Sequence, residues 1–255
     1  MRRTYGILYE PFGEKEALYV MRRMKAAGFS SLELSFGTAS PQPVCEAARE
    51  AGLVPHAARL PSDGASLLWD NMRVWNHLHA FYKTYFSLAA SHGIRRLVFS
   101  PSMGKTPPPV TQWGLERLAI LAEDAKEAGV CLLVENDESK PHFEAAARVM
   151  CPYGHEVSFR LHFAMEAFGT AVPPDYALPY ITRVVLEEQK AGYGRPLFGR
   201  TDLLTAADRL VRLASVSTLL VRQAQEEQSP EAYASRAYDT AYRFEQVLRN
   251  SEARL

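Results

Sequence analysis

The feature that most constrains the fold is an alternation of short apolar segments with helical patterns, which repeats eight times along the chain. The segments between the apolar runs carry apolar residues at helical spacing. Strands that alternate with helices pair in parallel and are covered by those helices. The sequence therefore predicts an α/β fold, a (β/α)8 TIM barrel, as a single domain over residues 1–255. The expected strands are 5–9, 31–36, 53–60, 96–100, 131–134, 157–163, 181–186 and 216–221, and one long helix is expected over 68–91.

A doubly wound open sheet is the alternative fold for the same alternation. Such sheets carry a glycine-rich phosphate loop after an early strand. The sequence has no GxGxxG, no GxxxxGK[ST] and no GxSxG motif. Its length of 255 residues is also typical of one barrel. The barrel is therefore favoured.

Composition narrows the classes of function. Lys+Arg and Asp+Glu balance at 29 each, so there is no basic footprint for nucleic acid or for an anionic membrane. The three cysteines are too scattered for a disulfide framework or a metal site, which favours a reducing compartment. No apolar run approaches the roughly 20 residues that span a bilayer, and the start of the chain is typical of a first strand rather than a signal peptide. We expect a cytoplasmic protein with no nucleic-acid and no membrane partner.

The fifth apolar segment runs directly into three polar residues, Glu135, Asn136 and Asp137. A short apolar strand between two helices is typical of a parallel strand that is buried on both faces. The C-terminal ends of such strands are where these folds place ligands and chemistry. A glutamate there is costly without a partner. We therefore interpret Glu135 as a functional residue, with a helix cap or a solvated loop as the alternative.

The other predicted strand ends add carboxylates, histidines and arginines, a set able to bind a polyol or an acid and to move a proton. Each residue is weak evidence by itself, because a glutamate inside a strand needs a partner such as an arginine, and because a histidine there is more often structural. The predicted catalytic residues are Glu135, Glu166 and Glu188. The predicted substrate-binding residues are Glu33, His56, Arg59, Asn136, His162, Arg183 and Arg222.

Four stretches of the chain resemble the sugar phosphate isomerase/epimerase superfamily, the xylose isomerase-like TIM barrels, which include apurinic nucleases of the endonuclease IV type. They are 26–36 (AAGFSSLELSF), 48–57 (AREAGLVPHA), 89–98 (AASHGIRRLV) and 118–136. Their order and spacing are similar to the family over most of the chain. The resemblance implies a barrel that isomerises or epimerises carbohydrates. It also implies a divalent cation, held by Glu, Asp, His and Glu on strands five to eight, that polarises the sugar oxygens.

Only the first of these cation ligands, Glu135, carries over to this chain. One hard oxygen ligand cannot meet the coordination that Mg²⁺ or Mn²⁺ requires, and Arg183 and Arg222 in the same mouth would oppose a cation. We therefore expect a degenerate metal site and no cofactor, with a divalent metal at Glu135 as the alternative. The remaining ligand positions fall on Ala164, Ala167, Val185 and residues 220–222, none of which is a carboxylate or a histidine.

Three functions fit these observations. The first, our prediction, is a metal-independent isomerase or epimerase of a sugar or sugar phosphate, in which Glu135 with Glu166 or Glu188 transfers a proton and an arginine replaces the metal. The second is a non-catalytic relative that binds a carbohydrate or an anion. The third is an apurinic-type nuclease, disfavoured by the zero net charge and the missing ligands. The expected partner is a small-molecule sugar, sugar acid or sugar phosphate, and a homodimer is left open.

Overall fold

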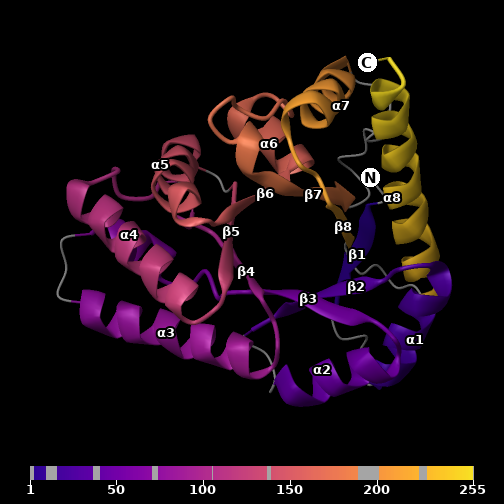
Figure 1. The fold of residues 1–255 in the computed structure, drawn as a ribbon, viewed down its shortest axis with the longest axis horizontal. Coiled ribbons are helices and arrows are strands. Elements are labelled where there is room, and N and C mark those ends of the chain that lie inside the picture. Colours follow the sequence, from indigo (N-terminus) through magenta and orange to yellow (C-terminus); the bar gives the residue numbers. More distant parts are fainter. Residues whose placement is uncertain are drawn as a thin grey trace.

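The eight strands form a closed parallel barrel. The computed structural model describes residues 3–9, 16–36, 41–70, 74–104, 106–136, 139–188, 201–223 and 229–254. The strands pair in chain order from β1 to β8, and β8 pairs with β1, so the sheet has no free edge. Figure 1 looks along this barrel, with the strands in an inner ring and the helices around it. The prediction of a TIM barrel is confirmed.

The strands are four to eight residues long, and helices lie between them in sequence. The strands are β1 (Thr4–Leu8), β2 (Ser31–Ser35), β3 (Val54–Arg59), β4 (Arg96–Phe99), β5 (Cys131–Glu135), β6 (Glu156–Arg160), β7 (Ile181–Glu188) and β8 (Thr218–Gln223). The helices are α1 (Ala17–Ala27), α2 (Pro41–Glu50), α3 (Trp75–Ser91), α4 (Gln112–Glu127), α5 (Lys140–Met150), α6 (Leu161–Phe168), α7 (Thr201–Leu213) and α8 (Pro230–Glu252). Short 3-10 helices lie at η1 (Ala65–Trp69), η2 (Cys151–Tyr153) and η3 (Leu178–Tyr180).

Local sequence signals begin and end several of these helices. The Ser229 hydroxyl caps α8 by accepting a hydrogen bond from the Ala232 N–H, and Pro230 occupies the first helical position. The α1 helix ends at Gly28, whose φ of 113° favours glycine and whose N–H donates to the Lys25 carbonyl. Among the described residues, no helix is long and apolar enough to cross a bilayer.

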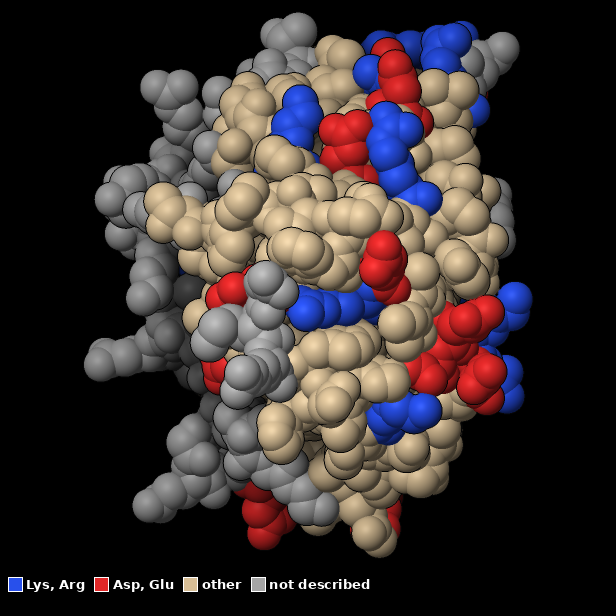
Figure 2. Space-filling model, turned by 90° about the vertical axis from the view of Figure 1, so that its left-hand side faces the viewer, with Lys and Arg blue, Asp and Glu red and all other residues tan. Residues whose placement is uncertain are grey.

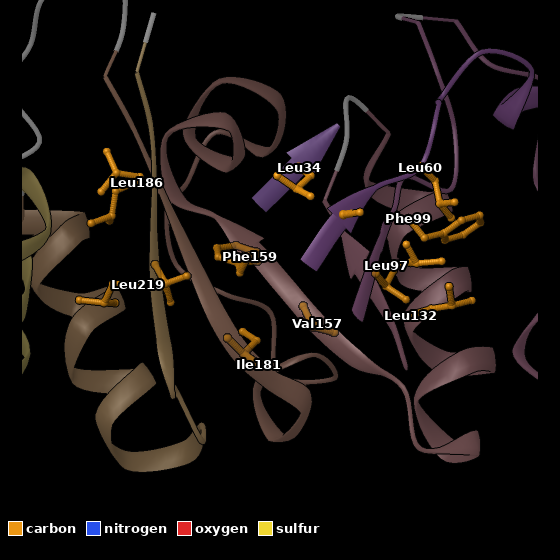
Figure 3. Packing of buried hydrophobic residues seen from close by; sticks show 14 of the residues in the cluster. Leu34, Leu60, Leu97, Phe99, Leu132, Val157, Phe159, Ile181, Leu186 and Leu219 are labelled. Carbon is orange, nitrogen blue, oxygen red and sulfur yellow. The ribbon is translucent and has the colours of Figure 1, made fainter. Parts of the chain in front are cut away.

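The main apolar core lies between the barrel and the surrounding helices. Alternate residues of each strand point outwards into it, so Leu97 and Phe99 of β4 lie beside Leu132 and Val134 of β5. Figure 3 shows the first three of these side chains packed together. Burying one such side chain stabilises the fold by about 1.5–3 kcal/mol. The remaining alternate residues, which carry most of the polar groups, are directed into the barrel.

The predicted long helix over 68–91 is wrong. The chain forms η1, adopts an extended backbone at Asp70, and starts α3 only at Trp75. The Arg117 Nη1 atom stabilises the break, because it donates to the carbonyls of Leu67, Leu68 and Asp70 at the end of η1.

The predicted sixth strand, 157–163, is too long at its C-terminal end. The observed strand β6 ends at Arg160, and α6 begins at the next residue. The Asn136 side chain explains this end, because its Nδ2 donates to the Arg160 carbonyl (3.1 Å) and its Oδ1 accepts from the Arg160 N–H (2.6 Å). These bonds satisfy both backbone groups of Arg160, so the strand ladder stops there.

Candidate functional site

The interior of the barrel is partly polar. TIM barrels usually fill this space with layers of branched aliphatic side chains. Here a small apolar cluster of Ala57, Val98 and Leu133 lies on the inner side of the sheet, where Val185 and Leu220 are also buried, and charged side chains take other inner positions. Two glutamates, Glu33 of β2 and Glu135 of β5, take inner positions and have no solvent exposure. Buried carboxylates require partners, and arginines supply them.

The ion pairs of these glutamates cross the barrel. The Arg183 Nη1 on β7 donates to Glu33 Oε2 (2.5 Å), and the Arg222 Nη2 on β8 donates to Glu33 Oε1 (2.8 Å). Arg222 also bridges to Glu135, since its Nη1 donates to Oε2 (2.9 Å) and its Nη2 to Oε1 (2.8 Å). Strands β2 and β7 are not neighbours, nor are β5 and β8. These contacts therefore pass through the barrel interior.

Glu135 accepts hydrogen bonds on both of its oxygens. Besides Arg222, the Arg59 Nη2 donates to Oε2 (2.5 Å) and the Ser158 hydroxyl donates to Oε1 (3.2 Å). Burial alone would raise the pKa of Glu135, but Arg222, Arg59 and Arg160 outweigh it and hold that pKa well below its usual value. Glu135 is therefore a fully paired carboxylate anion.

Glu33 is also a buried carboxylate whose pKa the neighbouring arginines lower. Burial would raise its pKa, and the charges of Arg183, Arg222 and Arg59 lower it. Arg183, which is only 3% exposed, also donates from Nε to the Ser158 hydroxyl (2.9 Å). The two glutamates and three arginines therefore form one hydrogen-bonded network inside the barrel.

Among the described residues of the network, three side chains at the C-terminal mouth are the most exposed. Arg59 is 23% exposed, Arg160 is 21% exposed and Glu187 is 17% exposed. The Arg160 Nε and Nη2 both donate to Glu187 Oε1 (2.8 and 2.6 Å). The Arg160 guanidinium also stacks over the Phe163 ring at 3.9 Å from the ring centroid. These contacts fix the Arg160 side chain at the rim.

Arg160 and Glu187 are site residues that the sequence prediction omitted. The predicted sixth strand, 157–163, places Arg160 in the middle of a strand, whereas the observed strand ends there. A signal was present, because Glu156, Ser158 and Arg160 follow the period of two that places polar residues on the inner face. Glu187 of β7 is the register partner of Arg222 of β8.

The structure brings five predicted residues together and separates others from them. Glu33, Arg59, Glu135, Arg183 and Arg222 form the network described above. His56 lies one residue before Ala57, the register partner of Glu33. Burial and the charges of Arg96 and Arg183 lower the pKa of His56 to about 4. His56 therefore lies near both Arg183 of the network and the Arg96–Glu156 ion pair (3.1 Å).

The remaining predicted residues lie beside the network or outside the described part. Both polar groups of the Asn136 amide bind the Arg160 backbone, so Asn136 ties β5 to β6. His162 is partly buried in the first turn of α6. Glu166 lies in α6 and Glu188 ends β7, but their side chains lie outside the described residues, as does Asp137. Roles of these residues in binding or catalysis stay predictions.

The donor set of the mouth does not fit a divalent cation. The Arg222 guanidinium donates to both oxygens of Glu135, where a cation would have to bind. The other positions implied by the resemblance hold two alanines of α6 and the buried Val185. In the described ranges there is no group of three or more His, Cys, Asp or Glu side chains that could hold a metal ion. Guanidinium groups thus surround the one carboxylate that the resemblance assigns to the metal.

Comparisons by sequence and by structure differ in outcome. No protein-family model and no curated protein matches the sequence. A structure of L-ribulose 3-epimerase matches with a TM-score of 0.72 at 17% identity, covering 99% of this chain and 97% of that chain. The D-allulose 3-epimerase from Methylomonas sp., in complex with D-allulose, matches with a TM-score of 0.69 at 13% identity, covering 98% and 97%.

A fusion protein of a xylose isomerase-like TIM barrel with a 4-hydroxyphenylpyruvate dioxygenase gives a TM-score of 0.74 at 13% identity. That match covers 98% of this chain but only 44% of the fusion protein, so the chain spans less than half of that relative. At these identities the likeness shows the fold. The chain therefore shares the (β/α)8 barrel fold of these proteins.

Proposed function

We propose, starting from the fold shared with two sugar 3-epimerases, that this chain is a sugar isomerase/epimerase-like protein that binds a small carbohydrate-like molecule at the mouth of its barrel. In this proposal the buried carboxylates hold arginines in place and do not transfer protons. One observation carries it: Glu33 and Glu135 are sealed from solvent and paired with arginines, and Arg59 among these reaches the mouth.

The state of Glu135 favours binding over proton transfer by that residue. A general base works best with a pKa near the operating pH and a free lone pair directed at the substrate. The pKa of Glu135 is held well below its usual value by Arg222, Arg59 and Arg160 against the effect of burial. Four hydrogen bonds also occupy its two oxygens. Glu135 would have to lose these partners before it could accept a substrate proton.

The charge distribution gives no support to the nuclease alternative. Figure 2 shows the side of the molecule that lies at the left of Figure 1. On the described part of this face, lysines and arginines are interspersed with aspartates and glutamates. Binding to DNA depends on a gathered basic surface. The sequence as a whole has equal numbers of acidic and basic residues.

The proposal predicts that a small carbohydrate-like molecule binds at the mouth, and that a bulky side chain introduced there abolishes the binding. Saturation-transfer difference NMR would use neutral monosaccharides, alditols, aldonates and sugar phosphates of three to six carbons. We expect at least one of them to bind the natural protein. Ser35, an exposed residue that pairs in register with Arg59, takes the inner side of the β2 end. Ser35→Trp should remove the signal because the indole fills the space beside Arg59.

The matched control is Ser91→Trp, because Ser91 is an exposed serine at the far end of α3. That variant should bind like the natural protein. Absence of any signal across the panel would contradict the proposed function. A signal that Ser35→Trp leaves unchanged would place the binding elsewhere on the molecule and contradict the proposed site.

Turnover as an isomerase or epimerase is a second candidate function, and Glu187 favours it. Its side chain is partly exposed at the mouth, and its Oε2 has no hydrogen-bond partner among the described residues. The same samples in D₂O discriminate the two functions. Stable C–H signals of the bound sugar are expected for a binding protein. Exchange with solvent that Glu187→Gln abolishes would instead establish proton transfer.

A further inference from the structure

We infer that the ligand of this mouth carries a carboxylate group, which Arg59 and Arg160 hold between them, so that the ligand is a sugar acid rather than a neutral sugar. This inference rests on the proposed function, since it names the class of molecule that the same site would take. Three features of the described residues carry it: an excess of positive charge, hydrogen-bond donors without acceptors, and the position of the two arginines.

The network has more positive than negative groups. Among the described residues it contains four guanidinium groups and three carboxylates, which leaves one positive charge. An uncompensated charge in a largely buried network is unfavourable, and a bound anion would offset it. The arginines are Arg59, Arg160, Arg183 and Arg222, and the carboxylates are Glu33, Glu135 and Glu187.

The network also contains arginine N–H donors that have no hydrogen-bond acceptor among the described residues. Two buried nitrogens of the network, Arg183 Nη2 and Arg222 Nε, have no hydrogen-bond partner among the described residues, and Arg183 Nη2 lies 3.6 Å from Glu135 Oε1 as an ion-pair contact. At the rim, the Nη1 atoms of Arg59 and Arg160 bind no described residue, because the contacts of these two arginines are made through Nε and Nη2. Both rim arginines are partly exposed, so their Nη1 atoms can donate to a molecule that enters the mouth.

The two rim arginines converge on one position. The Arg59 Nη2 lies 2.5 Å from Glu135 Oε2, and the Arg160 Nε lies 3.9 Å from the same oxygen. Their guanidinium groups therefore lie beside the same oxygen of Glu135. Contacts with Glu187 and the Phe163 ring hold the Arg160 plane in place. A carboxylate between the two groups would accept from both, which is the geometry that guanidinium groups favour.

The single excess positive charge of the described network indicates which kind of anion it would bind. A carboxylate carries one negative charge and would neutralise the described network. A phosphate monoester carries about −1.5 to −2 at neutral pH and would leave the network negative. A neutral sugar would leave the excess positive charge and the free donors as they are. The carboxylate of a sugar acid is therefore the group that matches both the charge and the donors.

Matched pairs of ligands test this inference by isothermal titration calorimetry. Glycerate, threonate and gluconate would each be compared with glycerol, threitol and glucitol, which replace the carboxylate by a hydroxymethyl group, and with glucose 6-phosphate. We expect at least one acid to bind roughly 10- to 100-fold more tightly than its neutral partner, which is the range for a hydrogen-bonded ion pair. Its affinity should fall as salt is raised.

Substitutions of Arg160 test whether the tighter binding of acids depends on the rim arginines. Arg160→Gln should reduce the affinity for the acid to that of the neutral partner and leave the neutral partner unchanged. Arg160→Lys should recover only part of the loss, because it keeps the charge without the planar fork. The matched control is Arg22→Gln, since Arg22 forms an exposed surface pair with Glu50. That control should bind the acid like the natural protein.

The outcomes separate the two proposals. If neutral sugars bind as tightly as their acids, or if Arg160→Gln weakens both equally, the carboxylate inference is wrong and the proposed binding function stands. If glucose 6-phosphate binds more tightly than every acid, the choice of a singly charged group is wrong. If no molecule of either panel binds, the proposed function fails, and the inference fails with it.

Discussion

Replacing Glu135 by glutamine is expected to reduce the free energy of unfolding by about 3–5 kcal/mol, the usual cost of removing one partner from a buried ion pair. The carboxylate has no solvent exposure and accepts hydrogen bonds from Arg59, Arg222 and Ser158. Its loss leaves Arg59, Arg183 and Arg222, which are largely removed from water, with Glu33 as their shared carboxylate partner among the described residues. For a chain of this length the melting temperature should fall by about 6–20 °C.

Urea unfolding of the natural protein and the variant measures this effect. Glu144→Gln is the matched control, because Glu144 pairs with Arg148 on the surface of α5 at i, i+4. Such a pair contributes about 0.3–0.5 kcal/mol. Equal and small losses for the two variants would mean that the Glu135 ion pairs do not stabilise the barrel interior.

Lowering the pH from 7 to 4 is expected to cost about 3 kcal/mol of stability through His56 alone. Burial and the charges of Arg96 and Arg183 lower the pKa of His56 to about 4 in the folded protein, from 6.5 in the unfolded chain. Between these values the unfolded chain binds a proton that the folded protein does not, so stability falls as the pH falls. Burial also lowers the pKa of His142 and His155, which adds to the loss in the same direction.

At lower pH, protonation of the buried carboxylates reduces the stability of the fold further. The pKa values of Glu33 and Glu135 are held below normal by the surrounding arginines, against the effect of burial. Their stabilisation is therefore present above the ordinary glutamate value, about 4.3, and is lost as the pH falls through their folded pKa values. Urea unfolding between pH 4 and 7.5 separates the two effects. The stability of His56→Gln should depend less steeply on pH above 4.5, and curves of equal slope would contradict the histidine assignment.

The fold could be predicted from the sequence because its periodic patterns are local. Each apolar strand and each amphipathic helix is marked by a run of a few residues, and their alternation permits few folds. The two errors arose where a distant side chain ends an element. Arg117 binds the carbonyls that end η1, and the Asn136 amide ends β6 at Arg160. Neither contact is visible in a local pattern.

The candidate site could be predicted only in part. Glu33, Arg59, Glu135, Arg183 and Arg222 were recognisable as polar residues at strand positions that should be apolar. Their partners were not recognisable, because an ion pair between β2 and β7 depends on the register and closure of the whole barrel. The expectation that Glu135 transfers a proton stays a prediction.

The position of the Arg222 guanidinium between the two buried glutamates is tested most directly by a crystal structure at neutral pH with Mn²⁺ in the medium. We expect Arg222 within hydrogen-bond distance of both Glu33 and Glu135, as in the present structure, and no anomalous scattering at Glu135. An anomalous Mn²⁺ peak coordinated by Glu135, with Arg222 turned away from it, would contradict an arginine-filled barrel.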